Sequence, residues 1–137
     1  MFTKKNEKPV KNILFSLSTE AKIYLSPYIY SLIKKNGRSL YATLGTRDYF
    51  QNNHNVRMVL VSKITQEKSE DFTDAVRMTD LIEKKVVDLI INVPSEQNNI
   101  EDEISDGELI RRLAAEMGIP IITSKEEASL FLHELSI

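Results

Sequence analysis

Short apolar runs that alternate with longer helix-like segments are the feature that most constrains the fold of this chain. The run at residues 86–93, VVDLIINV, holds a single charged residue. Such a run is typical of a strand that is buried on both faces. Similar runs lie at residues 13–17, 39–42, 56–61 and 119–122. Strands of this kind, separated by helices, predict a parallel sheet covered on both sides.

The segments between these runs carry apolar residues at helical spacing. We expect helices at residues 21–35, from Thr46 onward, at 72–84, at 106–117 and from 125 to about 135. Pro27 lies inside the first of them, so that helix either kinks there or begins its regular part at residues 26–27. The S-x-x-E box at residues 124–127 marks the start of the last helix.

We therefore predict an α/β fold: a three-layer, doubly wound sheet of five mostly parallel strands with helices on both faces. A length of 137 residues favours one domain. Residues 1–10 are basic and polar and are expected to form a flexible lead-in, while residues 11–137 form a ligand-binding domain. Polar loops are expected at residues 63–71 and 94–103.

Composition excludes several classes of function. The chain has no cysteine, which excludes disulfides, thiolate zinc sites and cysteine catalysis. His54 and His133 stand at no metal-ligand spacing, so no metal and no cofactor is expected. A net charge of −2 argues against nucleic acid as a partner. No apolar run reaches membrane-spanning length and no signal peptide is evident, so we expect a cytoplasmic protein without membrane contact.

Polar residues follow every predicted strand, at the edge where an open parallel sheet binds its ligands. They are hydroxyl, amide and lysine side chains and one glycine: Ser18, Thr19, Lys22, Thr43, Gly45, Thr46, Ser62, Lys63, Asn92, Ser95, Thr123, Ser124 and Lys125. Such groups suit an anion that is held by helix N-termini and backbone N–H groups.

Simpler interpretations exist for the main candidates. Lys22 opposes the dipole of its helix, which points to a function, although it could simply extend into water. Thr46 could be a helix N-cap, and Gly45 could serve only the turn. Lys63 taken alone could be a surface lysine.

Six sequence segments in order suggest a family. Lys22 follows the first strand, and ATLGT at 42–46, VSK at 61–63, DLIINVP at 88–94, DGELIRR at 106–112 and GIPIITS at 118–124 come after it. From about residue 11 to residue 135 the chain resembles the methylglyoxal-synthase-like domain. The resemblance implies the same doubly wound sheet. One branch of that family is an enzyme, and the other is the C-terminal allosteric domain of the carbamoyl-phosphate synthetase large chain.

The enzyme branch acts on dihydroxyacetone phosphate with a set of carboxylates. Its principal catalytic position falls on Ala75 here, one residue from Asp74. A second aspartate of the enzyme falls on Pro94, and a histidine falls near Glu103. Only Asp106 matches a third aspartate. The resemblance therefore argues against methylglyoxal synthase, and Asp74 with Asp106 is the acid/base pair of this alternative.

The allosteric branch matches better. It implies that Lys22, Thr43, Gly45, Thr46, Lys63, Asn92 and Ser95 bind a phosphorylated or carboxylated effector such as UMP, IMP or N-acetylglutamate. Lys63 favours the nucleotide-binding form, whereas NVPS at residues 92–95 is closer to the animal form that binds N-acetylglutamate. The implied partner is the rest of a carbamoyl-phosphate synthetase, attached or associated, in pyrimidine or arginine biosynthesis. A homo-oligomer, or a stand-alone protein with an unrelated interaction role, stays open.

Asp106, Arg111 and Arg112 belong to the last polar segment. Adjacent arginines on a helix point about 100° apart, so both cannot serve one site equally. We expect one of them to pair with a carboxylate or to pack against a neighbouring subunit or domain. Asp106 is expected to cap its helix.

Overall fold

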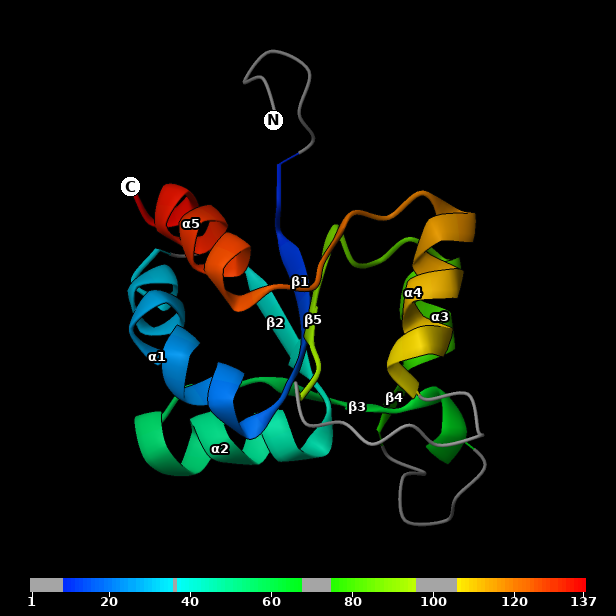
Figure 1. Cartoon of the computed structure of the whole chain (residues 1–137), viewed down its shortest axis with the longest axis horizontal. Helices are drawn as coiled ribbons and strands as arrows, with labels where there is room; N and C mark the ends of the chain where they lie inside the picture. Colours follow the sequence, from blue (N-terminus) through cyan, green and yellow to red (C-terminus); the bar gives the residue numbers. More distant parts are fainter. Residues whose placement is uncertain (1–8, 36, 68–74, 96–105) are drawn as a thin grey trace.

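The computed structural model describes residues 9–35, 37–67, 75–95 and 106–137. In these ranges the chain forms one sheet with helices on both sides (Figure 1). The strands are β1 (Asn12–Leu17), β2 (Ser39–Ala42), β3 (Val59–Ser62), β4 (Val76–Arg77), β5 (Leu89–Val93) and β6 (Ile121–Ile122). The helices are α1 (Thr19–Ile33), α2 (Leu44–His54), the 3-10 helix η1 (Ile64–Gln66), α3 (Met78–Glu83), α4 (Asp106–Met117) and α5 (Lys125–Ser136).

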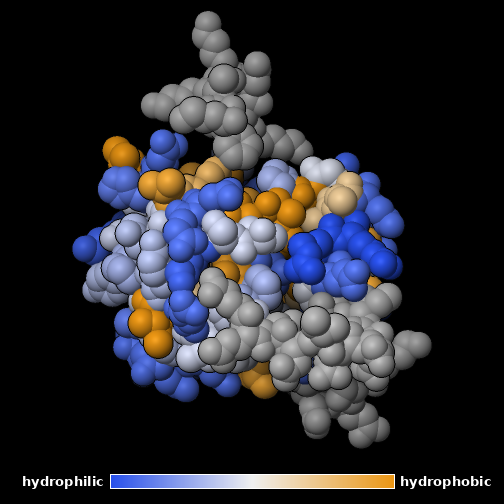
Figure 2. Space-filling model, viewed as in Figure 1, coloured by the Kyte–Doolittle hydropathy of each residue, from blue (hydrophilic) through white to orange (hydrophobic). Residues whose placement is uncertain are grey.

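The strands lie in the order β4-β3-β2-β1-β5-β6, and every neighbouring pair is parallel. Helices α1, α2 and α5 cover one face of the sheet, and α3 and α4 cover the other (Figure 1). Their outward surfaces are largely hydrophilic in the view of Figure 2. The three-layer, doubly wound parallel sheet is therefore confirmed.

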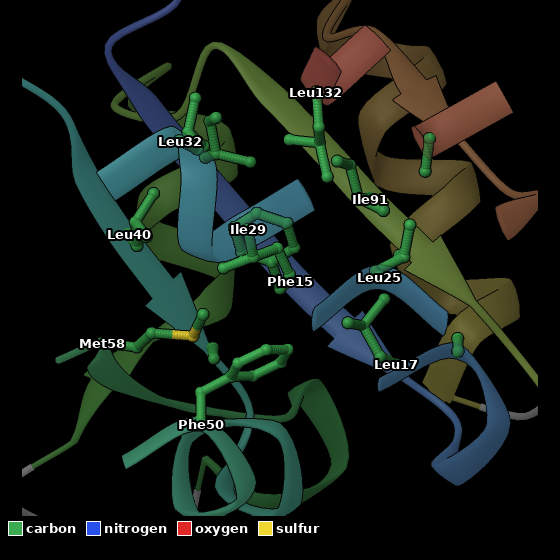
Figure 3. Packing of buried hydrophobic residues seen from close by; sticks show 14 of the residues in the cluster. Phe15, Leu17, Leu25, Ile29, Leu32, Leu40, Phe50, Met58, Ile91 and Leu132 are labelled. Atoms are coloured by element: carbon green, nitrogen blue, oxygen red, sulfur yellow. The ribbon is translucent and has the colours of Figure 1, made fainter. Parts of the chain in front are cut away.

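Alternation along β1 divides the apolar residues between two cores. Ile13, Phe15 and Leu17 face α1, α2 and α5, whereas Leu14 faces α3 and α4. In Figure 3, Phe15 and Ile91 pack against α1 and α5. Because β1 and β5 are buried on both faces, nearly all of their residues must be apolar, which is why they were visible as continuous runs.

The strand count differs from the prediction. We expected five strands and a helix over residues 72–84. The structure has one additional strand, β4, at Val76–Arg77, and α3 begins only at Met78. Residues 72–74 lie outside the described part. Val76 pairs with Val61 at the edge of the sheet, so tertiary pairing overrides the helical spacing of the apolar residues there.

The start of α1 also differs from expectation. Helix α1 begins at Thr19 and continues through Pro27, so the late start at residues 26–27 is wrong. Its cap is Ser18, whose Oγ accepts a hydrogen bond from the N–H of Ala21 at 3.2 Å. Proline has no N–H to donate to the carbonyl of Ile23. Ile23 is 61% exposed, so water can satisfy that carbonyl.

The connections place a switch point between β1 and β5. After β1 the chain passes through α1 on one face, and after β5 it passes through α4 on the other. Ligands of open α/β sheets bind at the carboxyl ends of the two strands that flank such a point. Among the described residues no helix combines the length and apolar character needed to cross a membrane.

A carboxylate ties the other end of these two strands together. Asp88, just before β5, accepts hydrogen bonds from the backbone N–H groups of Lys11 and Asn12 through Oδ2, both at 2.9 Å.

Replacing Asp88 with Ala removes a charged acceptor, so we expect the free energy of unfolding to fall by about 1–3 kcal/mol. Urea unfolding measures this loss. Asp88→Asn keeps one acceptor oxygen and should lose less; equal stability of Asp88→Ala and the parent would contradict the role.

Candidate functional site

Buried polar side chains gather at the carboxyl edge of the sheet. Thr43, Thr46, Ser62 and Asn92 are each at most 4% exposed, and they lie at the ends of β2, β3 and β5 and in the first turn of α2. Buried polar groups normally have hydrogen-bond partners. The Oγ of Ser62 has none within the described residues. This edge therefore holds polar groups that the fold alone does not satisfy.

The ATLGT segment enters α2 earlier than predicted. Helix α2 begins at Leu44, its N-cap is Thr43, and the Thr43 side chain makes no capping hydrogen bond. Thr46 lies inside the helix, and its Oγ1 accepts a hydrogen bond from the N–H of Leu17 at 3.0 Å. The interpretations of Thr46 as a cap and of Gly45 as a turn residue are both wrong. Within the described residues, neither hydroxyl donates a hydrogen bond that the structure records.

The side chain of Lys22 lies against Gly45. A Cβ at position 45 would be 3.3 Å from the Nζ of Lys22. The ammonium group therefore lies close to the first turn of α2, where backbone N–H groups already carry partial positive charge. A cation at this place is unfavourable by itself and is stabilised when an anion lies between it and the helix.

A second lysine adds to the positive charge. Burial lowers the pKa of Lys22 below the ordinary lysine value of 10.5, and repulsion by Lys63 lowers this pKa further. Neither lysine forms an ion pair within the part of the chain that the structure describes. Lys63 is positioned by its own backbone, since its N–H donates to Oε1 of Gln66 and its carbonyl accepts from the N–H of Gln66. Lys63 is thus near enough to repel Lys22, and no carboxylate among the described residues offsets this repulsion.

Asn92 connects this edge to the opposite layer. It pairs with Ser16 in the β1–β5 register, and its Nδ2 donates to the Ser16 carbonyl at 3.4 Å. Its Oδ1 accepts from Nη1 of Arg111 in α4 at 3.3 Å. Arg112 instead pairs with Glu108 at 3.6 Å, which is the pairing expected for one of the two arginines. Arg111 was not among the predicted site residues, because its contact with Asn92 joins segments 19 positions apart.

Asp106, the first residue of α4, links that helix to η1. Its Oδ1 accepts from the backbone N–H of Thr65 at 3.1 Å and from Thr65 Oγ1 at 3.3 Å. Its Oδ2 is buried and has no partner within the described residues. Asp74, its proposed partner in the enzyme alternative, lies outside the described residues.

Ser95 lies beside the other candidates in a separate hollow. A cavity of about 180 Å³ opens between the N-termini of α1 and α5. Its wall includes Pro94 and Ser95, together with the capping serines Ser18 and Ser124, but neither Lys22 nor Thr43. An ion pair between Lys125 and Glu20 bridges the two helix starts. The hydroxyls of both capping serines already serve as helix caps.

Most of the chain matches a known family model. The family model of the MGS-like domain matches residues 29–123, which include β2 to β6. The chain belongs to the MGS-like domain family. The resemblance inferred from the sequence segments is thereby confirmed.

The relatives of this MGS-like domain include carbamoyl-phosphate synthetases. The carbamoyl phosphate synthase large chain of Agathobacter rectalis is 37% identical over 102 residues, which are 74% of this chain and 9% of that protein. The multifunctional protein ura1 of Schizosaccharomyces pombe is 29% identical over 130 residues, 93% of this chain and 6% of that protein. The chain thus spans less than a tenth of the length of these relatives.

A solved structure supports the fold. The crystal structure of methylglyoxal synthase from Elizabethkingia anophelis NUHP1 superposes with a TM-score of 0.63, covering 89% of this chain and 76% of that one. The sequence identity is 16%, so this likeness shows the fold alone. Within the described residues of the MGS-like domain, no group of three or more His, Asp or Glu side chains could hold a metal ion.

The cost of placing Lys22 at this edge can be measured. Its pKa is lower in the folded chain than in the unfolded chain, so below that pKa the charge destabilises the fold. The penalty disappears as the pH rises to about 10.5. We expect Lys22→Met to melt at a higher temperature than the parent at pH 7, with the difference lost above pH 10.5. Lys34→Met, at the exposed end of α1, is the control; a destabilised Lys22→Met at pH 7 would contradict this account.

Proposed function

We propose that this MGS-like domain is a regulatory module that binds a small phosphorylated or carboxylated metabolite at the carboxyl edge of its sheet. Lys22 and Lys63 supply charge, Thr43 and Thr46 supply hydroxyl donors, and the first turn of α2 supplies backbone N–H groups. The observation that carries the proposal is the half-buried Lys22, which lies beside the first turn of α2, is repelled by Lys63 and has no carboxylate partner in the described residues. An anion would relieve this repulsion.

The main alternative is that Lys22 is only a solvated surface lysine. Its half-burial and its approach to Gly45 argue against that alternative. A surface lysine would keep the hydration of its ammonium group. Here the ammonium group instead lies beside the first turn of α2, in partial burial. This position supports anion binding over simple solvation.

We further propose that the bound effector regulates a carbamoyl-phosphate synthetase in the cytoplasm. The named relatives support this step, since the chain matches small parts of a carbamoyl phosphate synthase large chain and of a multifunctional protein. The effector would act by binding one conformation of the synthetase, attached or associated, more tightly than another. UMP, IMP and N-acetylglutamate are the effectors to compare. The described residues do not test the methylglyoxal synthase alternative, because Asp74 lies outside them and Thr65 binds only Oδ1 of Asp106.

A ligand panel tests the site. We expect phosphate, UMP, IMP or N-acetylglutamate to raise the melting temperature of the parent protein. At about a hundred times its dissociation constant, a ligand adds roughly 2.7 kcal/mol, which is several degrees for a domain of this size. Lys22→Met should lose this shift and Lys34→Met should keep it. An equal shift in Lys22→Met would place the ligand elsewhere, and methylglyoxal formed from dihydroxyacetone phosphate would favour the enzyme alternative.

The lowered pKa of Lys22 also predicts a pH dependence. The lysine must be protonated to bind an anion, and the bound anion raises its pKa again. We therefore expect the affinity for sulfate, which stays dianionic throughout, to fall as the pH rises toward 10.5, with proton uptake on binding. Calorimetry in buffers of different ionisation enthalpy measures both quantities. A pH-independent affinity between pH 7 and 10 would exclude Lys22 as the charged contact.

A further inference from the structure

We propose that Arg111, held by Asn92, forms a second anion-binding point at the same edge of the sheet. The ligand class would then be a short metabolite with two anionic groups, one bound by Lys22 and Lys63 and the other, a carboxylate, bound by Arg111. This inference rests on the proposed function and deepens it by naming the class of ligand.

Arg111 has binding capacity that the protein does not use. Its guanidinium group is half-buried, and among the described residues it makes one hydrogen bond, from Nη1 to the neutral amide oxygen of Asn92. Within the described residues no carboxylate lies within 4.0 Å of Arg111. A guanidinium group has five N–H donors in a planar fork that matches a carboxylate. Most of these donors stay available to a ligand.

Gly107 allows this placement. A Cβ at position 107 would lie 3.2 Å from Nη1 of Arg111 and 3.3 Å from Oδ1 of Asn92. These contacts are tighter than usual, so a side chain at position 107 would require Arg111 or Asn92 to shift by a few tenths of an ångström. Gly107, in the first turn of α4, thus lets the guanidinium group lie against Asn92 without that shift. Lys22 approaches Gly45 in the same way, with its Nζ at 3.3 Å from where a Cβ would be.

A row of hydrogen bonds leads from Arg111 to Thr46, in the turn of α2 that Lys22 approaches. Asn92 reaches the Ser16 carbonyl, and the next residue, Leu17, donates its N–H to Thr46, which follows Gly45 in α2. This row crosses the ends of β5 and β1 toward β2, two strand spacings or about 10 Å. In Figure 2 strongly hydrophilic side chains gather over α4, the helix that carries Arg111.

Two probes that differ in one group test the proposal. Glycerol 3-phosphate and 3-phosphoglycerate share a phosphate and a three-carbon chain, but only the second carries a carboxylate. We expect calorimetry to show that the parent protein binds 3-phosphoglycerate at least about tenfold more tightly, because bonds to charged groups are the stronger ones. Arg111→Met should reduce this ratio to near one while leaving the affinity for glycerol 3-phosphate within about threefold.

Arg112→Met is the matched control, since it removes the same charge from the next position of α4, where the side chain pairs with Glu108. It should keep the preference for 3-phosphoglycerate, whereas Gly107→Ala should weaken that preference. Far-UV circular dichroism and urea unfolding show whether each variant is folded. Equal affinities in the parent, or an unchanged ratio in Arg111→Met, would overturn the second anion-binding point alone. Absence of binding by phosphate and by both probes would overturn the proposed function with it.

Discussion

The parallel pairing of β1 with β5 is the interaction on which the rest of the structure depends. Both strands are buried on both faces, and their register places Ser16 beside Asn92. Because α1 follows β1 and α4 follows β5, both helices begin at the carboxyl edge, and they cover opposite faces of the sheet. Lys22 and Arg111 therefore approach that edge from two different layers. A one-residue slip of this register would turn Asn92 away from Arg111.

The polar groups of this edge differ in what they do for the fold. Thr46 is structural, since its Oγ1 satisfies the buried N–H of Leu17. Lys22 destabilises the free domain, because burial and Lys63 both disfavour its charge. Such local conflicts between stability and side-chain choice are expected at functional sites. Gly45 and Gly107 share one feature, since a cationic group lies close to each, at 3.3 Å and 3.2 Å from where a Cβ would be.

Much of the fold was predictable, because the periodicity of apolar residues is a local signal. Continuous runs revealed the central strands, and the S-x-x-E box at residues 124–127 revealed α5, where Ser124 Oγ accepts from the N–H of Glu127. The edge strand β4 was missed because two residues carry no period, and only their pairing with β3 defines them. The start of α2 was misplaced because Thr43 and Thr46 are equally good N-caps by residue type.

The sequence by itself determined the alternation of strands and helices, the membership of the MGS-like domain family and the kinds of polar residue that follow each strand. These properties depend on residue type and spacing along the chain. The tertiary structure decided which of those residues meet. It brought Lys22 to Gly45, joined Asn92 to Arg111 and left Ser95 in a neighbouring hollow. Contacts of this kind depend on strand order and on which face each helix covers, and residue spacing along the chain does not encode either of them directly.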